Sequence, residues 1–403
     1  MTLERLWSTP PLKQHYDVVI IGGGIHALAT AYFLAKNHGI TDVAVLERNH
    51  IGFGGACRNT AIVRANQHTQ KNVNFYKEGL GMWQGLMEEL DFNMMFHNCG
   101  ILDVLHSEDD FAIARNSVST AKFCGVQSEI LDQKQVKELV PELNLSEDIR
   151  HPIIGGMYHS PGGILRHDGV VWGFAKGASR LGVHIHQQID VEEILVENGR
   201  VAGVQTSQGK IHSPKVMINS GAYGNLLAYQ LGIALPIHTL TIQACVTQPL
   251  KPFLHTIVAS GAYWVYANQT LKGEIAAGAH MDPWPNYTTQ TTPQYLKHLT
   301  RGLVEIMPCL KGVKYMRHWS GLADMTPDSA PIMEGNYPIG GLFMNVGWGY
   351  FGFKAGAVSG KYMAKYMAAD QRPKVLENFS LGRFEQFESN GENPYAYAYG
   401  PNN

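Results

Sequence analysis

Three small residues near the N-terminus have the spacing of a phosphate-binding turn. Gly22 and Gly24 follow directly after the apolar run 18–21, and Ala27 lies three residues further along the chain. In such a turn the first glycine permits a tight bend, the second lets the backbone approach a pyrophosphate, and the third small residue lets the next helix pack against the strand. A helix that begins here points the positive end of its dipole at phosphate groups. The spacing therefore predicts a nucleotide-binding turn.

The segments on either side of this turn complete a β-α-β unit. We expect residues 18–21 to form a short strand buried on both faces, followed by a helix that stops at Gly39. We expect residues 42–47 to form a second buried strand. It ends in Glu47, whose carboxylate can accept hydrogen bonds from ribose hydroxyls. The alternative is a glycine turn in an ordinary α/β protein.

A second glycine cluster and two arginines follow this unit. Three glycines between residues 52 and 55 make a flexible loop, and Arg58 and Arg64 come after it. We interpret the loop as passing beneath the distal end of the nucleotide, with Arg64 binding an anionic substrate. The alternative is a glycine loop with solvated arginines. We interpret Cys57, in the same loop, as a small semi-buried residue.

Another glycine-rich turn precedes a helix near the C-terminus, in the segment "VGWGYFGFKAG". Its backbone amides are a second place where the chain could meet a nucleotide. Lys354 falls at the start of this helix, among aromatic residues and glycines. A cation near a helix N-terminus is electrostatically unfavourable, so this position calls for an anionic partner. A solvated lysine is the alternative.

His167 lies in the segment "PGGILRHDG", directly before another helix-like run. It could cap the helix, bind a metal, move a proton or carry a cofactor. The 18 histidines form no H-x-x-x-H or H-E-x-x-H pattern, so we predict no metal site. Asp168 is better suited to cap the helix, because its carboxylate can accept amide hydrogens there. Proton transfer and cofactor attachment stay open.

Composition argues against several classes of protein. The 403-residue chain is 45% hydrophobic and 16% charged, which is enough for a large core and two or three domains. Its net charge of −2, without a Lys/Arg tract, argues against nucleic-acid binding. Five scattered cysteines without a C-x-x-C pair indicate a reducing compartment. Because residues 1–15 lack a secretory signal and no apolar run could span a bilayer, we expect a cytoplasmic protein with no membrane contact.

Four stretches resemble the β subunit of heterotetrameric sarcosine oxidase, one of the FAD-dependent amine oxidoreductases related to glycine and D-amino-acid oxidases. The stretches are "YDVVIIGGGIHALATAYFLAKNHGITDVAVLER", "RNTAIVRAN", "GGILRHDGVVWGFAKGA" and "VGWGYFGFKAG". The resemblance extends from about residue 16 to about residue 367. The chain has Ile25 and Ala27 where the family commonly has glycine, and both are compatible with FAD.

The resemblance implies an α/β fold with two interleaved domains. One is an FAD-binding Rossmann-like domain of the glutathione-reductase type, and the other is an α+β substrate domain built on a mixed sheet. We expect the N-terminal arm to be extended and disordered rather than packed on a partner. The predicted segments are 1–15 for the arm, 16–90, 160–230 and 320–385 for the FAD-binding domain, 91–159 and 231–319 for the substrate domain, and 386–403 for a C-terminal tail.

The resemblance also implies two flavins and several partner subunits. FAD is held without a covalent bond. FMN is attached covalently to the histidine that matches His167, at the interface with a large α subunit, and Arg166 lies in its vicinity. A neutral imidazole nitrogen can attack an activated flavin methyl group. Small γ and δ subunits complete the complex, and NAD and tetrahydrofolate are expected only in the α subunit.

The site residues are carried over by position. Arg64 and Lys354 resemble the pair that clamps a substrate carboxylate in the monomeric relatives, which suits an arginine fork and a lysine point charge. The predicted FAD-binding residues are Gly22, Gly23, Gly24, His26, Ala27, Glu47, Arg48, Gly54, Arg58, Asn59, Thr60, Gly347, Gly349, Gly352, Phe353 and Lys354.

The implied reaction is oxidation of the C–N bond of a secondary amino acid. The most direct reading is conversion of sarcosine to glycine plus formaldehyde or methylene-tetrahydrofolate, with electrons passing from FAD to FMN to oxygen. One alternative is the FAD subunit of a related proline, opine or other amino-acid dehydrogenase complex that uses another acceptor. The other is a non-catalytic FAD-bearing scaffold, which would have no need of a carboxylate clamp.

Overall fold

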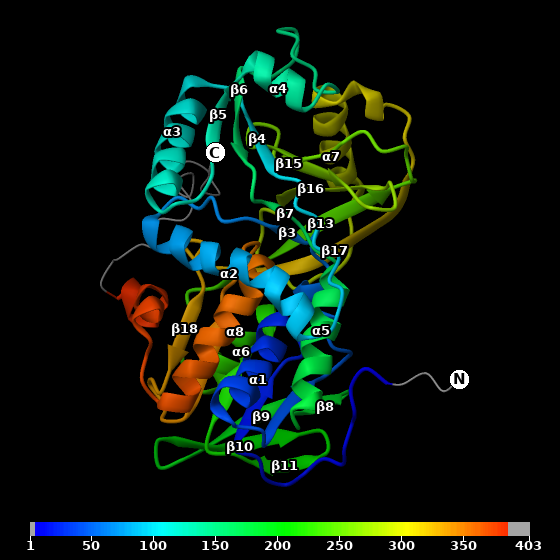
Figure 1. Cartoon of the computed structure of the whole chain (residues 1–403). Helices are drawn as coiled ribbons and strands as arrows, with labels where there is room; N and C mark the ends of the chain where they lie inside the picture. The colour runs from blue at the N-terminus through cyan, green and yellow to red at the C-terminus, as the bar shows by residue number, and fades with distance from the viewer. Residues whose placement is uncertain (1–4, 386–403) are drawn as a thin grey trace.

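The computed structural model describes residues 5–385, which form two layered parts, one above the other in Figure 1. The lower part is built on a six-stranded sheet and the upper part on an eight-stranded sheet. The predicted C-terminal tail, 386–403, lies outside the described residues. Within residues 5–385, none of the helices combines the length and apolar character needed to cross a membrane.

The six-stranded sheet is centred on β1 (Val18–Ile21), which pairs in parallel with its neighbours on both sides. Its side chains alternate between two apolar cores: Val18 and Ile20 face the helices, whereas Val19 and Ile21 face a smaller sheet. The prediction of a strand buried on both faces is therefore confirmed. The six strands in spatial order are β18 (Ile332–Gly335), β19 (Leu342–Val346), β12 (Val216–Ile218), β1, β2 (Val43–Glu47) and β8 (His184–Gln187), with β18 alone antiparallel to its neighbour.

Helices cover one face of this sheet, and two of them pack unusually closely. A Cβ atom at Gly356 of α8 would lie 2.3 Å from the Ile25 side chain of α1, and one at Gly360 would lie 2.5 Å from Ala29. Glycine at these two positions therefore lets α8 lie directly on α1, so that the N-termini of both helices reach the same end of the sheet. The covering helices are α1 (Ile25–His38), α2 (Gln70–Glu89), α5 (His167–Arg180) and α8 (Gly352–Ala369).

A three-stranded meander covers the opposite face. It consists of β9 (Val191–Glu197), β10 (Arg200–Thr206) and β11 (Gly209–His212), which pair antiparallel in sequence order. The strand before the meander, β8, pairs with β2 in the main sheet. The helices, the sheet and the meander thus make three layers, as in the predicted FAD-binding domain.

The eight-stranded sheet of the upper part is mixed, because β4 and β14 run parallel while the other neighbours are antiparallel. Helices α3 (Glu108–Phe123), α4 (Gln133–Leu139) and α7 (Pro293–Ile306) pack on it. The predicted boundary at residue 320 falls within β17. The strands in spatial order are β17 (Tyr315–Met325), β13 (His238–Thr247), β16 (Ile275–Met281), β15 (Val265–Gln269), β14 (Ile257–Ser260), β4 (Ile101–Leu105), β6 (Gly155–His159) and β5 (Glu129–Asp132).

Shorter elements link the two parts. The ribbon of β3 (Ile62–Val63) and β7 (Gly163–Ile164) lies between them, and α6 (Gly224–Gln230) follows β12. The described part of the N-terminal arm packs on this chain: the Ser8 amide donates to the Ser179 hydroxyl, and Lys13 pairs with Asp42 at 2.7 Å. The expectation of a disordered arm is therefore wrong for these residues, because polar contacts along it hold it to the lower part.

Candidate functional site

A cavity of about 1230 Å³ lies between the two parts. The first turns of α1 and α8 and the loops after β2 and β12 line it from the lower part, and strands β4, β14, β15 and β16 line it from the upper part. Pockets for drug-sized ligands measure roughly 300–1,000 Å³, so this cavity has room for an extended ligand. The predicted residues that line it are Gly22, Gly23, Gly24, His26, Glu47, Arg48, Gly54, Arg58, Asn59, Thr60, Arg64, Gly349, Gly352, Phe353 and Lys354.

The turn before α1 has the shape that its glycines predict. Gly22 has φ +111°, and a Cβ atom there would lie 2.3 Å from the Asn219 carbonyl oxygen, so glycine is required by the protein itself. Gly24, the N-cap of α1, has φ −82°, and a Cβ atom there would meet nothing closer than the Ala56 side chain at 4.0 Å. The space above Gly24 therefore belongs to the cavity and suits a phosphate group at a helix N-terminus.

Glu47 is held in place at the end of β2. Its two carboxylate oxygens accept hydrogen bonds from the backbone amides of Gly23 and Asn49, at 2.7 and 2.8 Å. Next to it, the side-chain nitrogen of Asn219 and the hydroxyl of Ser220 are buried at the cavity wall and have no hydrogen-bond partner within the described chain. Buried polar groups of this kind are normally satisfied, so a polar ligand fits here.

Arg48 and Tyr223 form a flat surface at the same end of the cavity. The Arg48 guanidinium carbon lies 3.9 Å from the centre of the Tyr223 ring. Both residues line the cavity, together with Leu226 on α6. A guanidinium over an aromatic ring is a favourable contact. The sequence did not indicate Tyr223, which comes from a segment 175 residues after Arg48.

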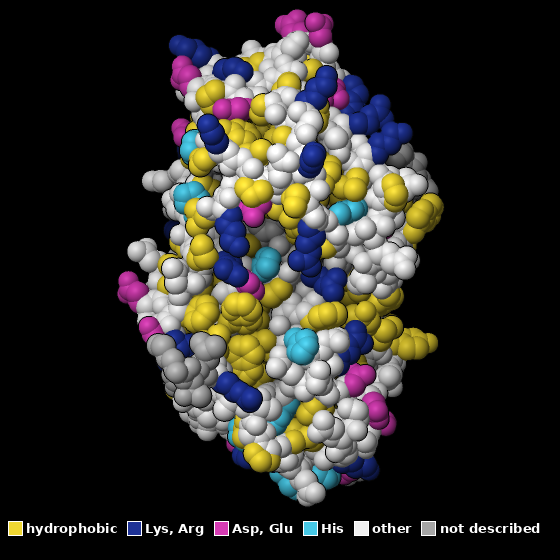
Figure 2. Space-filling model, turned by 90° about the vertical axis from the view of Figure 1, so that its right-hand side faces the viewer, with side chains coloured by type: hydrophobic (Ala, Val, Ile, Leu, Met, Phe, Trp, Pro, Cys, Tyr) yellow, Lys and Arg dark blue, Asp and Glu magenta, His cyan; other side chains and the backbone are white. Residues whose placement is uncertain are grey.

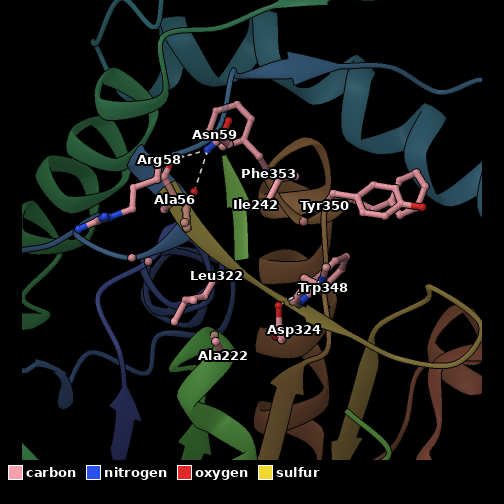
Figure 3. A pocket seen from close by; sticks show the side chains of 18 of the residues that line it. Ala56, Arg58, Asn59, Ala222, Ile242, Leu322, Asp324, Trp348, Tyr350 and Phe353 are labelled. Carbon is pink, nitrogen blue, oxygen red and sulfur yellow. Dashed lines mark hydrogen bonds between the residues drawn. The ribbon is translucent and has the colours of Figure 1, made fainter. Parts of the chain in front are cut away.

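The loop that carries Arg58 and Asn59 is fixed by its own hydrogen bonds. Asn59 donates to the carbonyl oxygens of Gly55 and Ala56 and accepts from the Ala61 amide. Arg58 donates to the Phe53 and Ser320 carbonyl oxygens, and Figure 3 shows its side chain extending away from the other labelled residues. Arg58 therefore ties the loop to β17 and is neither free in solvent nor aimed at the middle of the cavity.

Arg64 and Lys354 come together around Phe351. The Arg64 guanidinium carbon lies 5.8 Å from the centre of the Phe351 ring, and the Lys354 ammonium lies 4.8 Å from the same centre. Arg64 donates to the carbonyl and side-chain oxygens of Asn66, at 3.1 and 3.0 Å, and Lys354 donates to the Tyr350 carbonyl at 3.2 Å. Only 7% of Lys354 is exposed. A buried cation and a half-buried one at the same cavity wall favour an anionic ligand.

His26 supports the glycine turn before α8. Its Nδ1 shares a hydrogen bond of 2.5 Å with the Ser359 hydroxyl, and its ring stacks on Trp348 with 4.2 Å between ring centres. Burial lowers the pKa of His26 to about 3, so the imidazole is neutral at physiological pH. It lines the cavity as an uncharged flat surface.

Asp324 is a site residue that sequence reasoning missed. At the end of β17, its carboxylate accepts the Gly347 amide at 2.7 Å and the Gly349 amide at 3.2 Å, and it points towards the turn that carries Trp348 (Figure 3). Burial raises the pKa of Asp324 to about 6, although these backbone amides favour the charged form. The sequence suggested that backbone amides of this turn could meet a nucleotide. Those of Gly347 and Gly349 donate to Asp324 instead.

Replacing Asp324 with asparagine is expected to lower the free energy of unfolding by about 1–3 kcal/mol. Both carboxylate oxygens accept amide hydrogens, whereas asparagine offers one oxygen and presents an NH₂ group to the second amide. Denaturant unfolding measures the difference. The matched control is Asp109→Asn in the first turn of α3, where the side chain is exposed. Equal stability of the two variants would contradict the assigned role of Asp324.

Two of the predicted FAD-binding residues do not line the cavity. Ala27 is fully buried in the core between α1 and its neighbours, where its small size serves helix packing. Gly347 has φ +73°, a backbone conformation that favours glycine, and it belongs to the turn before α8 without lining the cavity. Cys57 is semi-buried as predicted, and burial raises the pKa of its thiol to about 12, so it is protonated at neutral pH.

His167 and Arg166 lie outside the cavity, at the start of α5. The N-cap of α5 is Arg166, without a side-chain cap, so Asp168 is not the N-cap residue, although its carboxylate accepts an amide hydrogen in the first turn as expected. Asp168 is instead the second helical residue. It accepts the Gly169 amide and forms a two-bond ion pair with Arg166, at 2.6 and 2.9 Å. A guanidinium two residues away competes for the carboxylate.

The His167 ring is partly enclosed. Its side chain is 32% exposed, and its Nδ1 is buried without a hydrogen-bond partner in the described part of the chain. Burial lowers the pKa of His167, and the positive charges of Arg166 and Arg317 lower it further, while Asp168 opposes them. Figure 2 shows Lys and Arg side chains on both sides of a hollow in the face on which α5 lies, with a His side chain inside it.

A three-layer dinucleotide-binding domain, joined to a mixed-sheet domain across a cavity lined by two neighbouring cations, is the arrangement of flavin-dependent oxidoreductases. Residues 17–366 match the family described as "FAD dependent oxidoreductase". The chain is 39% identical over 382 residues to the sarcosine oxidase subunit beta of Arthrobacter sp, covering 95% of this chain and 94% of that protein. It is 39% identical over 380 residues to the subunit beta of Rhizobium meliloti (strain 1021), covering 94% and 91%. The chain therefore belongs to the FAD-dependent oxidoreductases and, among them, to the sarcosine oxidase β-subunit family.

Solved structures share the fold of this chain. The L-proline dehydrogenase of P. horikoshii superimposes with a TM-score of 0.88 at 27% identity, covering 94% of this chain and all of that one. The glycine oxidase of Bacillus cereus ATCC 14579 superimposes with a TM-score of 0.79 at 24% identity, covering 90% and 97%. The predicted α/β fold, with an FAD-binding domain and a mixed-sheet substrate domain, is confirmed.

Proposed function

We propose that this chain is the catalytic FAD subunit of a heterotetrameric sarcosine oxidase and oxidises the C–N bond of a secondary amino acid. The observation that carries the proposal is the pair of cations, Arg64 and Lys354, around Phe351 in the cavity. The identity of 36–39% to three sarcosine oxidase β subunits supports sarcosine as the substrate. A non-catalytic scaffold would gain nothing from placing two cations at one wall of this cavity.

The residues present fit FAD. The open space over Gly24, the helix N-terminus behind it and the unpaired polar groups of Asn219 and Ser220 offer donors to a pyrophosphate and its sugars. The cavity continues from this end to the Arg64–Lys354 pair. We therefore assign these residues to a non-covalently held FAD, which supplies two-electron redox chemistry when bound.

The chain's own residues position the substrate. The Arg64 fork and the Lys354 point charge hold its carboxylate, which fixes the direction of the amine. Positive charge nearby also favours loss of the ammonium proton, and the neutral amine is the form that can be oxidised. Trp348, Phe351 and Phe353 line the cavity close to these cations and exclude water from the reacting carbon.

His167 suits covalent attachment of a second flavin, FMN. Burial lowers the pKa of its imidazole, its Nδ1 accepts and donates no hydrogen bond within the described residues, and Arg166 and Arg317 provide positive charge for a phosphate. Because the ring is partly exposed at the surface and outside the FAD cavity, FMN would lie between this chain and a large α subunit. Arg166 would then share its guanidinium between Asp168 and FMN.

The electron path, the fate of the one-carbon product and the partner subunits are inferred from the sarcosine oxidase β-subunit family. Electrons would pass from FAD to FMN to oxygen, and the one-carbon product would leave as formaldehyde or be taken up by tetrahydrofolate in the α subunit, which also holds NAD. Small γ and δ subunits would complete the complex. The specific observation in favour of a second candidate, a proline dehydrogenase complex with another acceptor, is the TM-score of 0.88 to an L-proline dehydrogenase.

Anaerobic titration of the assembled complex with sarcosine and with proline separates the two candidates. Sarcosine should bleach the flavin absorbance at a rate at least tenfold higher than proline does, and oxygen consumption should follow in air. Faster bleaching by proline, with no oxygen consumption, would favour the dehydrogenase. If no secondary amino acid bleaches the flavin, the non-catalytic FAD-bearing scaffold is the candidate function that remains.

His167→Ala is expected to remove covalent flavin from the chain while FAD is retained. Acid precipitation of the wild-type complex should leave one flavin on this chain and release one, because only one is bonded to the protein. The variant should release all its flavin. Mass spectrometry of the intact chain measures the adduct, with His184→Ala in β8 as a matched histidine control. An adduct that persists in His167→Ala would place the attachment elsewhere.

A further inference from the structure

The guanidinium of Arg64 is oriented by a nearby asparagine that does not itself line the cavity. Nη1 of Arg64 donates to the Asn66 carbonyl oxygen at 3.1 Å and to the Asn66 side-chain oxygen at 3.0 Å. Asn66 is 1% exposed, so close packing limits the movement of its side chain. Because the guanidinium is a rigid planar fork, holding one of its nitrogens restricts the directions in which the others can point.

The side-chain amide of Asn66 is held from both of its ends. Its oxygen accepts from Arg64, and its nitrogen is buried and has no hydrogen-bond partner in the described part of the chain other than Asp103, which is half-buried at the cavity wall. Burial raises the pKa of the Asp103 carboxyl group, and the charge of Arg64 and the hydrogen bond from Asn66 oppose this rise. A flipped amide would turn its NH₂ group to the guanidinium and its oxygen to the carboxylate, which is unfavourable at both ends.

The backbone between Arg64 and Asn66 is fixed as well. The Ala65 amide donates to Nε2 of His159, in β6, at 3.2 Å, and Nδ1 of the same ring lies 2.8 Å from the Gln127 carbonyl oxygen. A neutral imidazole accepts through one nitrogen and donates through the other, which matches these two bonds. Burial and the charge of Arg64 lower the pKa of His159 to about 4, although its bond to Gln127 opposes them. Residues of the upper part therefore hold the segment that carries Arg64.

We propose that Asn66 is a positioning residue that directs the Arg64 guanidinium at the carboxylate of the substrate. An arginine binds a carboxylate best through two parallel N–H···O bonds, which requires the two planes to match. With Nη1 held by Asn66, the substrate carboxylate meets the other N–H groups of the fork. This inference rests on the proposed function of the same cavity and adds a residue that acts through Arg64 without touching the substrate.

Asn66→Ala in the assembled complex tests the proposal. We expect KM for sarcosine to rise about tenfold, because one hydrogen bond to a charged group is lost while the backbone carbonyl still holds Nη1. The carboxylate is bound in the ground state and in the transition state alike, so kcat should change by less than about threefold. The dissociation constant of methoxyacetate, a carboxylate without an amine, should rise by the same factor as KM, measured from the flavin absorbance.

Two further variants separate this effect from a loss of packing. Asn66→Leu fills about the same space without polar atoms, and it should give the same rise in KM as Asn66→Ala. Asn268→Ala removes another buried asparagine, 3% exposed, from a position in β15 that does not line the cavity, and it should keep the wild-type KM. Flavin content and thermal unfolding are measured for each variant.

The background of Arg64→Met distinguishes a positioning role from a structural one. Asn66→Ala should cause no further loss of kcat/KM in that background, because the guanidinium through which Asn66 acts is already absent. Turnover of N-methylethanolamine, which lacks the carboxylate, should be equal in wild type and Asn66→Ala. A structural asparagine would instead give the same additional loss in both backgrounds and with both substrates.

Two results would overturn the proposal. One is an unchanged KM for sarcosine in both Asn66→Ala and Asn66→Leu, and the other is an equal loss from Asn66→Ala with and without Arg64. If sarcosine does not reduce the flavin of the wild-type complex, the proposed function fails as well. Reduction of the wild-type flavin by sarcosine, together with either of the two results, overturns the role of Asn66 alone.

Discussion

Arg64→Met is expected to lower kcat/KM for sarcosine about 10²- to 10³-fold while FAD stays bound. The guanidinium lies in the cavity with Lys354, and both are within 6 Å of the centre of the Phe351 ring. A substrate carboxylate brought between them loses its water and needs both partners. Removing one partner leaves a buried anion half satisfied, which costs about 3–5 kcal/mol.

The design of this experiment separates the clamp from the fold. Lys354→Met should give a loss of similar size, and the double variant should lose less than the two single losses combined, because both residues act on one carboxylate. N-methylethanolamine, which lacks the carboxylate, should be turned over weakly and equally by wild type and Arg64→Met. Arg115→Met on the exposed face of α3 is the control for removal of an arginine. Unchanged kinetics for sarcosine would refute the clamp.

The features predicted correctly from the sequence are those determined by neighbours along the chain. The strand at residues 18–21, the turn at Gly22 and the helix that stops at Gly39 follow from local rules on apolar runs and positive φ, and the structure has them at these residues. The same rules place Lys354 in the first turn of α8. The family resemblance added Arg64 as its partner, which periodicity alone does not indicate.

The residues missed by the sequence analysis depend on contacts between distant segments. Asp324 meets the turn at Gly347 only because β17 ends beside it, and Tyr223 meets Arg48 only because β12 lies next to β1. Asp103 is the one polar residue of β4, and it lines the cavity. No neighbouring residue in the sequence indicates that this face of the strand borders a cavity. Asp168 accepts an amide hydrogen in the first turn of α5 as expected, but the helix begins at His167, so the N-cap is Arg166 and not Asp168.

Gly24→Ala is expected to weaken FAD binding at least tenfold while leaving the protein folded. Alanine is compatible with φ −82°, and its Cβ would make only an ordinary contact of 4.0 Å with Ala56, so the free energy of unfolding of the FAD-free chain should change by no more than about 1 kcal/mol. The added methyl group instead occupies the space that we assign to the pyrophosphate.

Gly22→Ala, two residues away, is the matched variant. It should mainly reduce the stability of the chain, whereas Gly24→Ala should mainly reduce its affinity for FAD. Its Cβ would lie 2.3 Å from the Asn219 carbonyl oxygen at φ +111°, so it should destabilise the FAD-free chain by more than about 1–2 kcal/mol. FAD affinity by titration and thermal unfolding of the FAD-free chain measure the two effects separately. If the turn were only structural, Gly24→Ala would keep both its stability and its affinity for FAD. Loss of FAD without loss of stability in Gly24→Ala is the result that only a cofactor-binding turn produces.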